Sequence, residues 1–300
     1  MSEAEFDRIA DVYDETRRAL DEETLGGLMQ MLTKYGCRSV LEIAVGTGRV
    51  SVPLMRRGYE ITGVDISRRM IEKARAKGLA NLVLADGRGT AFKDGSFDAV
   101  LMAHVLHLLE DPLVVMREGA RVSRIGVFAL FRKGTREWPR FGFWGGVPTT
   151  TNHAAGTAGR VNDQGFNVQA AVKLLEERRE RFRKIAEKYH WTWDSARRVR
   201  NWGRETEILE SYPPDELKVV SDVVVTETLE DRIARFQKGG YGFMSEMPAE
   251  MREEVIKQMR ADAASLPEWA RQPRHEVYQV AMWRSEKLLR CLRSYSRSMG

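Results

Sequence analysis

The sequence predicts an α/β protein with a doubly wound sheet. Short apolar runs of strand length alternate with segments of helical periodicity, and each of the first four runs brings a polar residue at or just after its end. Strands that alternate with helices of this length predict right-handed crossovers and a parallel sheet. These four runs are SVLEIA (39–44), EITGVD (60–65), NLVLAD (81–86) and FDAVLM (97–102).

The first run and the turn after it predict a ligand site. Residues 39–44 are too few for a helix and rich in branched side chains, which is typical of a strand buried on both faces. Gly46 and Gly48 follow, and glycine lets a turn adopt unusual angles and a ligand approach the backbone. Backbone N–H groups of the next helix would point at that ligand. We interpret residues 40–50 as a nucleotide-cofactor cradle; the alternative is an ordinary strand-to-helix turn.

Polar residues at the ends of the later runs support this interpretation. Asp65 ends the second run 19 residues after Gly46, about where doubly wound folds place the carboxylate that binds ribose hydroxyls. Asp86 ends the third run, and His104 follows the fourth. Because parallel strands end at one edge of a sheet, these groups should gather where open α/β sheets bind ligands.

The turn resembles the first motif of the class I S-adenosylmethionine (SAM) dependent methyltransferases, an acidic residue followed by x-G-x-G-x-G. Here Glu42 is the acidic residue, and Ala44 stands where the first glycine would be. A nicotinamide-binding Rossmann domain is the main alternative, but its third glycine would fall at Ser51 and it does not call for Asp86.

The resemblance implies a seven-stranded sheet of order 3-2-1-4-5-7-6 with strand 7 antiparallel. Residues 124–131, 218–229 and 275–283 are the expected strands 5, 6 and 7. It also implies SAM as the cofactor and S-adenosylhomocysteine as the product. The residues expected to bind the cofactor are Glu42, Ala44, Gly46, Gly48, Asp65, Ile66, Asp86, Gly87 and His104.

Three residues are candidates for contact with the reacting groups. His104 and His107 follow the fourth strand, and an imidazole titrates near neutrality and suits proton abstraction. The alternative is that either histidine only caps or packs the following helix. Tyr13 lies in an F-D-x-x-A-x-x-Y-D opening at residues 6–14, which is similar to that of ubiquinone/menaquinone-type methyltransferases, where it folds over the cofactor.

The second half of the chain has a different composition. Residues 132–165 are rich in glycine, threonine and aromatics without periodicity, which predicts a lid over a substrate pocket or, alternatively, a disordered loop. All seven tryptophans follow residue 137, which fits a cap around an apolar substrate. The predicted segments are a cofactor half (1–131), a lid with helices (132–218), the end of the sheet with a helical insertion (219–284) and a basic tail (285–300).

Charge and composition limit the partners. The net charge is +5, and residues 284–300 hold five basic residues against one acidic, so the basic character belongs to the tail and not to a face. Two distant cysteines and no HExxH motif predict no metal site. No apolar run approaches the roughly 18 residues needed to cross a bilayer, and the acidic N-terminus differs from a signal peptide, so we expect a cytoplasmic protein.

We therefore expect in-line transfer of a methyl group from SAM to a small hydrophobic or aromatic acceptor. The alternatives are an RNA methyltransferase that uses the basic tail, and a non-catalytic regulator that binds SAM or a nucleotide. The fourth strand does not end in D/N-P-P-Y/F and no Pro-Cys pair is present, which disfavours two classes of nucleic-acid methyltransferase but not methylation of RNA ribose or ring nitrogens.

Overall fold

The computed structural model describes residues 3–133, 168–192, 204–225, 228–239, 247–265 and 274–293. The chain divides into two compact units. Unit 1 comprises residues 1–133, 203–223 and 275–300, and unit 2 comprises residues 134–202 and 224–274. These boundaries differ from those of the predicted segments, whose roles remain proposals.

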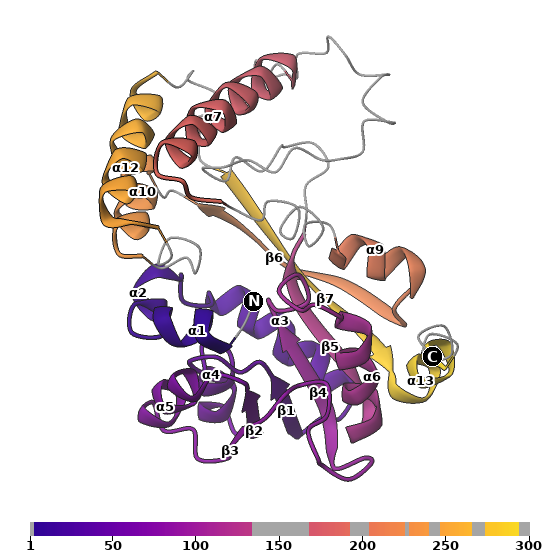
Figure 1. Ribbon diagram of the computed structural model, residues 1–300. Helices are drawn as coiled ribbons and strands as arrows, with labels where there is room; N and C mark the ends of the chain where they lie inside the picture. The colour runs from indigo at the N-terminus through magenta and orange to yellow at the C-terminus, as the bar shows by residue number, and fades with distance from the viewer. Residues whose placement is uncertain are drawn as a thin grey trace. The chain divides into compact units, whose positions relative to one another are not determined.

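The sheet has seven strands in the order β3-β2-β1-β4-β5-β7-β6 (Figure 1). The strands β1 to β5 pair in parallel, whereas β7 pairs antiparallel with β5. The predicted fold class, strand order and antiparallel seventh strand are therefore confirmed. The strands are β1 (Ser39–Ile43), β2 (Glu60–Asp65), β3 (Leu82–Leu84), β4 (Phe97–Ala103), β5 (Ser123–Arg132), β6 (Glu216–Val225) and β7 (Arg274–Arg284).

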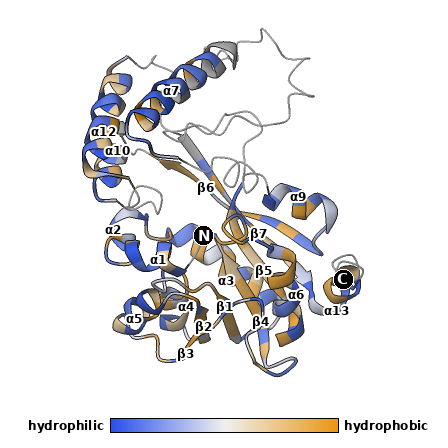
Figure 2. Ribbon diagram, in the orientation of Figure 1, coloured by the Kyte–Doolittle hydropathy of each residue, from blue (hydrophilic) through white to orange (hydrophobic). Residues whose placement is uncertain are grey.

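Helices cover both faces of this sheet. Side chains alternate along each strand, so neighbouring residues enter different cores. Val40 packs with α3 in one core, whereas Leu41 packs with α6 in the other. The sheet strands are mainly hydrophobic in Figure 2, as expected for strands buried on both faces. The helices of unit 1 are α1 (Glu3–Ile9), α2 (Tyr13–Thr16), α3 (Glu22–Lys34), α4 (Ser51–Arg56), α5 (Arg68–Ala76), α6 (Pro112–Val122), α9 (Arg204–Ser211) and α13 (Ser285–Leu292).

Local capping explains where the crossover helices begin. The Ser67 hydroxyl accepts a hydrogen bond from the backbone N–H of Met70 and caps α5. Asp111 caps α6, and Pro112 occupies the first turn, where its missing N–H is tolerated. Each cap involves residues at most three positions apart, so both helix starts follow from the local sequence.

The segment predicted as a basic tail, residues 285–300, begins with a helix. Residues 285–292 form α13, which packs on α6. Leu288 and Leu292 are each 1% exposed, because their i, i+4 spacing places both on the buried side of the helix. The last residues, 294–300, lie outside the described part of the chain.

Unit 2 has a helical core of its own. Helices α7 (Val168–Lys188), α10 (Leu229–Gln237) and α12 (Ala249–Ala264) contribute to it. Phe182 and Ile185 of α7 are buried there, as the helical spacing predicted. Residues 134–165 of the predicted lid lie outside the described residues. Among the helices that are described, none is long and apolar enough to cross a membrane.

Two adjacent glycines in α3 test its packing on the sheet. A Cβ at Gly27 would lie 2.5 Å from the Cβ of Val220 in β6, whereas a Cβ at Gly26 would meet nothing within 4 Å. Gly27→Ala should lower the free energy of unfolding by about 1–3 kcal/mol through overpacking. Gly26→Ala should raise it by about 0.5–1 kcal/mol, since alanine favours a helix. Urea unfolding of both variants measures these changes in the free energy of unfolding. Changes of the same sign in the two variants would contradict the packing of Gly27 on Val220.

Candidate active site

The turn after β1 has the geometry of a ligand cradle. Ala44, Gly46 and Gly48 have φ of 61°, 55° and 77°. A Cβ at Gly46 would meet no protein atom within 4 Å, so this glycine borders open space. A Cβ at Gly48 would lie 2.9 Å from the Val52 side chain, so Gly48 allows the turn to pack on α4. Ala44 adopts a backbone that costs a non-glycine residue about 1–2 kcal/mol.

Asp65 connects this turn to the start of α5. Its Oδ2 accepts the N–H of Gly46 at 2.8 Å, and its Oδ1 accepts the N–H of Ser67 at 2.9 Å. Asp65 is 7% exposed, and burial raises the pKa of its carboxyl despite these hydrogen bonds. A carboxylate has about four lone-pair sites. The backbone N–H of Ile66 also acts on this carboxyl. At least one lone-pair site is therefore left for a hydroxyl, such as one of a ribose.

Glu42 lies beneath the cradle and is almost fully buried. Its Oε2 accepts a hydrogen bond from the hydroxyl of Ser51, the first residue of α4. Burial raises the pKa of Glu42 to about 8, which the Ser51 hydrogen bond only partly offsets. In this state Glu42 is mostly protonated at neutral pH and ties α4 to β1. Its predicted contact with the cofactor remains a prediction.

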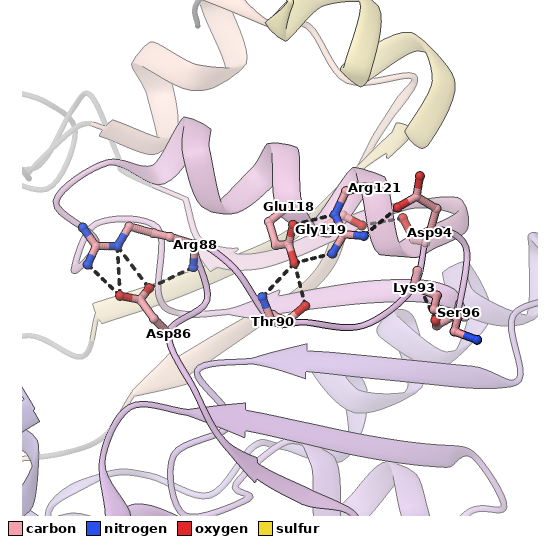
Figure 3. A network of polar contacts seen from close by, with 10 residues as sticks. Asp86, Arg88, Thr90, Lys93, Asp94, Ser96, Glu118, Gly119 and Arg121 are labelled. Carbon is pink, nitrogen blue, oxygen red and sulfur yellow. Dashed lines mark hydrogen bonds and ion pairs between the residues drawn. The ribbon is translucent and has the colours of Figure 1, made fainter. Parts of the chain in front are cut away.

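Asp86 and Gly87 lie in the loop after β3. The guanidinium of Arg88 holds the Asp86 carboxylate, with Nη2 2.6 Å from Oδ2, and this contact lowers the pKa of Asp86 (Figure 3). Ion pairs this exposed contribute little to stability, so Arg88 can give way to another hydrogen-bond donor such as an adenine amine. A Cβ at Gly87 would lie 2.6 Å from the Ile43 side chain, so Gly87 is required by packing.

A buried carboxylate fixes the far end of the same loop to α6. Glu118 Oε1 accepts the backbone N–H of Thr90 at 2.8 Å and its hydroxyl at 2.7 Å (Figure 3). Arg121 donates to both oxygens of Glu118 and pairs with Asp94. Burial would raise the pKa of Glu118, but the hydrogen bonds from Arg121 and Thr90 outweigh it and lower the pKa to about 2. The loop is thus anchored between strand and helix.

The N-terminal helices contact the cradle directly. The hydroxyl of Thr47, between the two glycines, donates to Asp14 at 2.6 Å. Tyr13 packs beside Met70, and the Arg17 guanidinium lies 4.9 Å from its ring centre. These contacts place the opening segment beside the cofactor cradle. The specific role of Tyr13 stays a prediction, while the Asp14 contact was not predicted.

His104 occupies a strained, half-buried position after the end of β4. Its φ is 56°, and its backbone N–H donates a hydrogen bond to the Leu130 carbonyl at 2.7 Å. Its Nε2 is buried without a hydrogen-bond partner in the part of the chain that the structure describes. Burial holds the pKa of His104 well below its usual range, aided by the charges of Arg49, His107 and Arg132. This neutral imidazole suits a hydrogen bond to a ligand better than proton uptake.

His107, the second predicted histidine, has a different environment. Its Nδ1 lies 2.9 Å from Oε1 of Glu205, a residue of α9. The side chains of His107 and Glu205 are 39% and 17% exposed. His107 is therefore oriented by a carboxylate and remains accessible.

A third group at this edge comes from β7. Glu276 is 7% exposed; it lies 2.5 Å from Arg132 Nη1 and accepts the Tyr278 hydroxyl at 2.9 Å. The ring of Tyr278 meets His104 edge-on, with centres 5.7 Å apart, and burial raises the pKa of Tyr278 to about 12. Sequence reasoning missed this group because it considered only strand carboxyl ends. A glutamate inside an apolar strand was the available signal.

The remaining site predictions have simpler outcomes. Ile66 is half-buried between Asp65 and Ser67, and its predicted contact with the cofactor stays a prediction. Within the described ranges, no group of three or more histidine, cysteine, aspartate or glutamate residues could hold a metal ion. The prediction that the reaction needs no metal remains a prediction.

Comparisons with known proteins single out the cradle half. Residues 41–131 match the family model described as a methyltransferase domain. A demethylmenaquinone methyltransferase of Thermotoga maritima is 35% identical over 127 residues, covering 40% of this chain and 55% of that protein. A ubiquinone biosynthesis O-methyltransferase of Xanthomonas oryzae pv. oryzae is 31% identical over 123 residues, covering 39% and 51%.

A third relative is named for a different acceptor. A phosphatidylethanolamine N-methyltransferase of Cereibacter sphaeroides is 38% identical over 94 residues, covering 29% of this chain and 46% of that protein. The chain therefore spans about half the length of the curated relatives it matches. The matched family region contains the cradle, both predicted aspartates and both histidines.

The anchor of the loop after β3 predicts a pH-dependent contribution to stability. Glu118→Gln should lower the free energy of unfolding by about 1–3 kcal/mol at neutral pH, because Arg121 loses its charged partner. The pKa of Glu118 falls from 4.5 to about 2 on folding. The carboxylate therefore stabilises the fold fully above pH 4.5, and this contribution is lost as the pH falls toward 2.

Denaturant unfolding of both proteins across this acidic range measures the effect, and the difference should shrink as the pH falls. Asp94→Asn is the matched control, since Asp94 contacts the same arginine but its side chain is 82% exposed. It should change stability little. An equal loss in both variants would contradict the anchoring role of Glu118.

Proposed function

We propose that the whole chain methylates a small hydrophobic or aromatic acceptor. The premise is that residues 41–131 form a class I SAM-dependent methyltransferase domain. The family predicted from residues 42–48 is confirmed by the matching model and relatives. The observation that carries the proposal is Asp65, whose carboxylate holds the cradle turn and α5 while keeping at least one lone pair for a ribose.

The residues present fit SAM as the cofactor. The open space beside Gly46 leaves room for the methionine end against the backbone, and Asp65 would hold the ribose hydroxyls. Asp86 would receive the adenine amine in place of Arg88. Bound there, SAM supplies an electrophilic methyl group on a sulfonium. The protein then has to position the acceptor in line with that methyl group and exclude water.

The names of the relatives and the residues at the strand ends bear on the acceptor class. Two relatives are named for quinones, which supports an aromatic acceptor, whereas the third is named for a phospholipid. All three likenesses cover 40% of this chain or less, so residues outside the match can contribute to selection of the acceptor together with residues inside it. His104, Tyr278 and the buried Glu276 line the strand ends where that selection would occur.

Three measurements separate the functions that the sequence left open. Calorimetry with SAM tests the cofactor, and formation of S-adenosylhomocysteine with small aromatic acceptors tests the transfer. Binding of RNA that weakens steeply with salt would favour the RNA methyltransferase instead. SAM binding without turnover of any acceptor would favour the non-catalytic regulator.

Asp65→Ala should weaken SAM binding by about 1–3 kcal/mol, because charge-assisted hydrogen bonds to the ribose are lost. Calorimetry measures the affinity, and thermal unfolding shows whether the sheet stays intact without this carboxylate. Glu60→Ala is the matched control, since Glu60 begins the same strand and is exposed. Unchanged SAM affinity in folded Asp65→Ala would contradict the assignment of Asp65.

Gly46→Val should abolish cofactor binding while the sheet remains folded. A Cβ at this position meets no protein atom within 4 Å, so the added side chain would occupy the space proposed for the ligand. The positive φ makes the branched residue strained, which should cost about 1–3 kcal/mol of stability. Calorimetry and thermal unfolding separate the two effects. Retained SAM affinity would show that the turn serves the fold only.

A further inference from the structure

The contact between His107 and Glu205 joins two distant parts of unit 1. His107 lies four residues beyond the end of β4, and Glu205 lies in the first turn of α9. The 2.9 Å separation of Nδ1 and Oε1 is a hydrogen-bond distance. Because the two residues are 98 positions apart in the chain, this contact depends on how α9 docks.

Several contacts hold α9 in place. The Arg204 guanidinium donates to the carbonyl of Leu109 and, at 2.9 Å, to that of Glu110. Ile208 is 5% exposed in the core beneath the sheet. At the end of the helix, the Trp283 indole donates to the Tyr212 carbonyl at 2.7 Å. Glu205 is therefore fixed relative to the segment that carries His107.

A carboxylate that accepts a hydrogen bond from one imidazole nitrogen determines the protonation of the other nitrogen. When Glu205 accepts the Nδ1–H, the opposite nitrogen, Nε2, has a lone pair and can take a proton. The carboxylate also stabilises the imidazolium that forms. Nε2 of His104 lacks such a carboxylate partner among the described residues, and this nitrogen atom is buried. Of the two histidines, His107 has the arrangement of a base.

We propose that His107 is the general base of the methyl transfer, that Glu205 is its positioning residue, and that the acceptor atom is a hydroxyl oxygen. This inference rests on the proposed function and specifies its acceptor. A base is useful only when the attacking atom carries a proton. A hydroxyl oxygen is such an atom, and one relative is named an O-methyltransferase.

The proposed step balances in atoms and charge. Nε2 of His107 takes the proton of the acceptor hydroxyl while an oxygen electron pair forms the new bond to the methyl carbon. The electron pair of the broken carbon–sulfur bond stays on sulfur, which gives S-adenosylhomocysteine. The imidazolium, stabilised by Glu205, then returns the proton to water. No further oxidant or reductant is needed.

The test uses the full chain and two phenolic probes. Catechol keeps most of its hydroxyls protonated at about pH 8, whereas the nitro group of 4-nitrocatechol leaves one hydroxyl ionised there. His107→Gln and Glu205→Gln should lower turnover of catechol about 100-fold or more and that of 4-nitrocatechol less than about tenfold. A merely structural role would lower both equally. Glu205→Asp should restore part of the catechol rate.

Glu207→Gln is the matched control, because Glu207 lies on the same helix with an exposed side chain. It should turn over both probes at the wild-type rate. A second readout needs no acceptor: the ring nitrogen chemical shifts of His107 report which nitrogen carries the proton. They should show the Nδ1–H form in the wild-type chain and its loss in Glu205→Ala.

Three results would overturn the inference in distinguishable ways. If His107→Gln turns over catechol at the wild-type rate, His107 and Glu205 have no catalytic role, and the proposed function still stands. If the wild-type chain binds SAM but methylates neither probe, the proposal of a hydroxyl acceptor is contradicted, and with it the catalytic role of His107 and Glu205. An unchanged tautomer of His107 in Glu205→Ala would show that Glu205 does not position the imidazole.

Discussion

One buried carboxylate determines the geometry of the cofactor half. Asp65 ends β2, yet its two oxygens hold the N–H of Gly46 in the turn after β1 and the N–H of Ser67 at the start of α5. Each of these N–H groups would otherwise need another partner in a region with little water. Burial raises the pKa of Asp65, so the site already tolerates a poorly solvated charge. Hydroxyl donors from a ligand would relieve that cost.

Other buried acids in unit 1 have partners of the same kind. Glu42, Glu118 and Glu276 are all nearly buried, and each has partners from a neighbouring element. The Ser51 hydroxyl donates a hydrogen bond to Glu42, and the Arg121 guanidinium donates to Glu118. Each acid thus ties a strand, a helix or a loop to its neighbour, because a buried carboxylate without partners would cost several kcal/mol. The polar groups that support the cradle are therefore also structural groups.

Local patterns predicted the strands and the cradle, since these depend on spacing within a few residues. The caps at Ser67 and Asp111 have the same local origin. The antiparallel seventh strand came from family resemblance and not from periodicity. The residues that were missed pair across long stretches of chain, such as Asp14 with Thr47. The buried leucines of α13 were overlooked because charges outnumber them in that segment. Tertiary contacts of this kind leave no local pattern.

The two histidines after β4 show why a site needs more than its motif. They are three residues apart and were equivalent candidates in the sequence. His104 takes a left-handed backbone conformation and its Nε2 is buried, and the pKa of its imidazole is held well below the usual range. His107 stays accessible and meets a carboxylate from a helix 98 residues away. The matched family region ends before that helix begins, so it supplies the imidazole while α9 supplies its partner. Relatives with the same cofactor half can therefore differ in how they activate an acceptor.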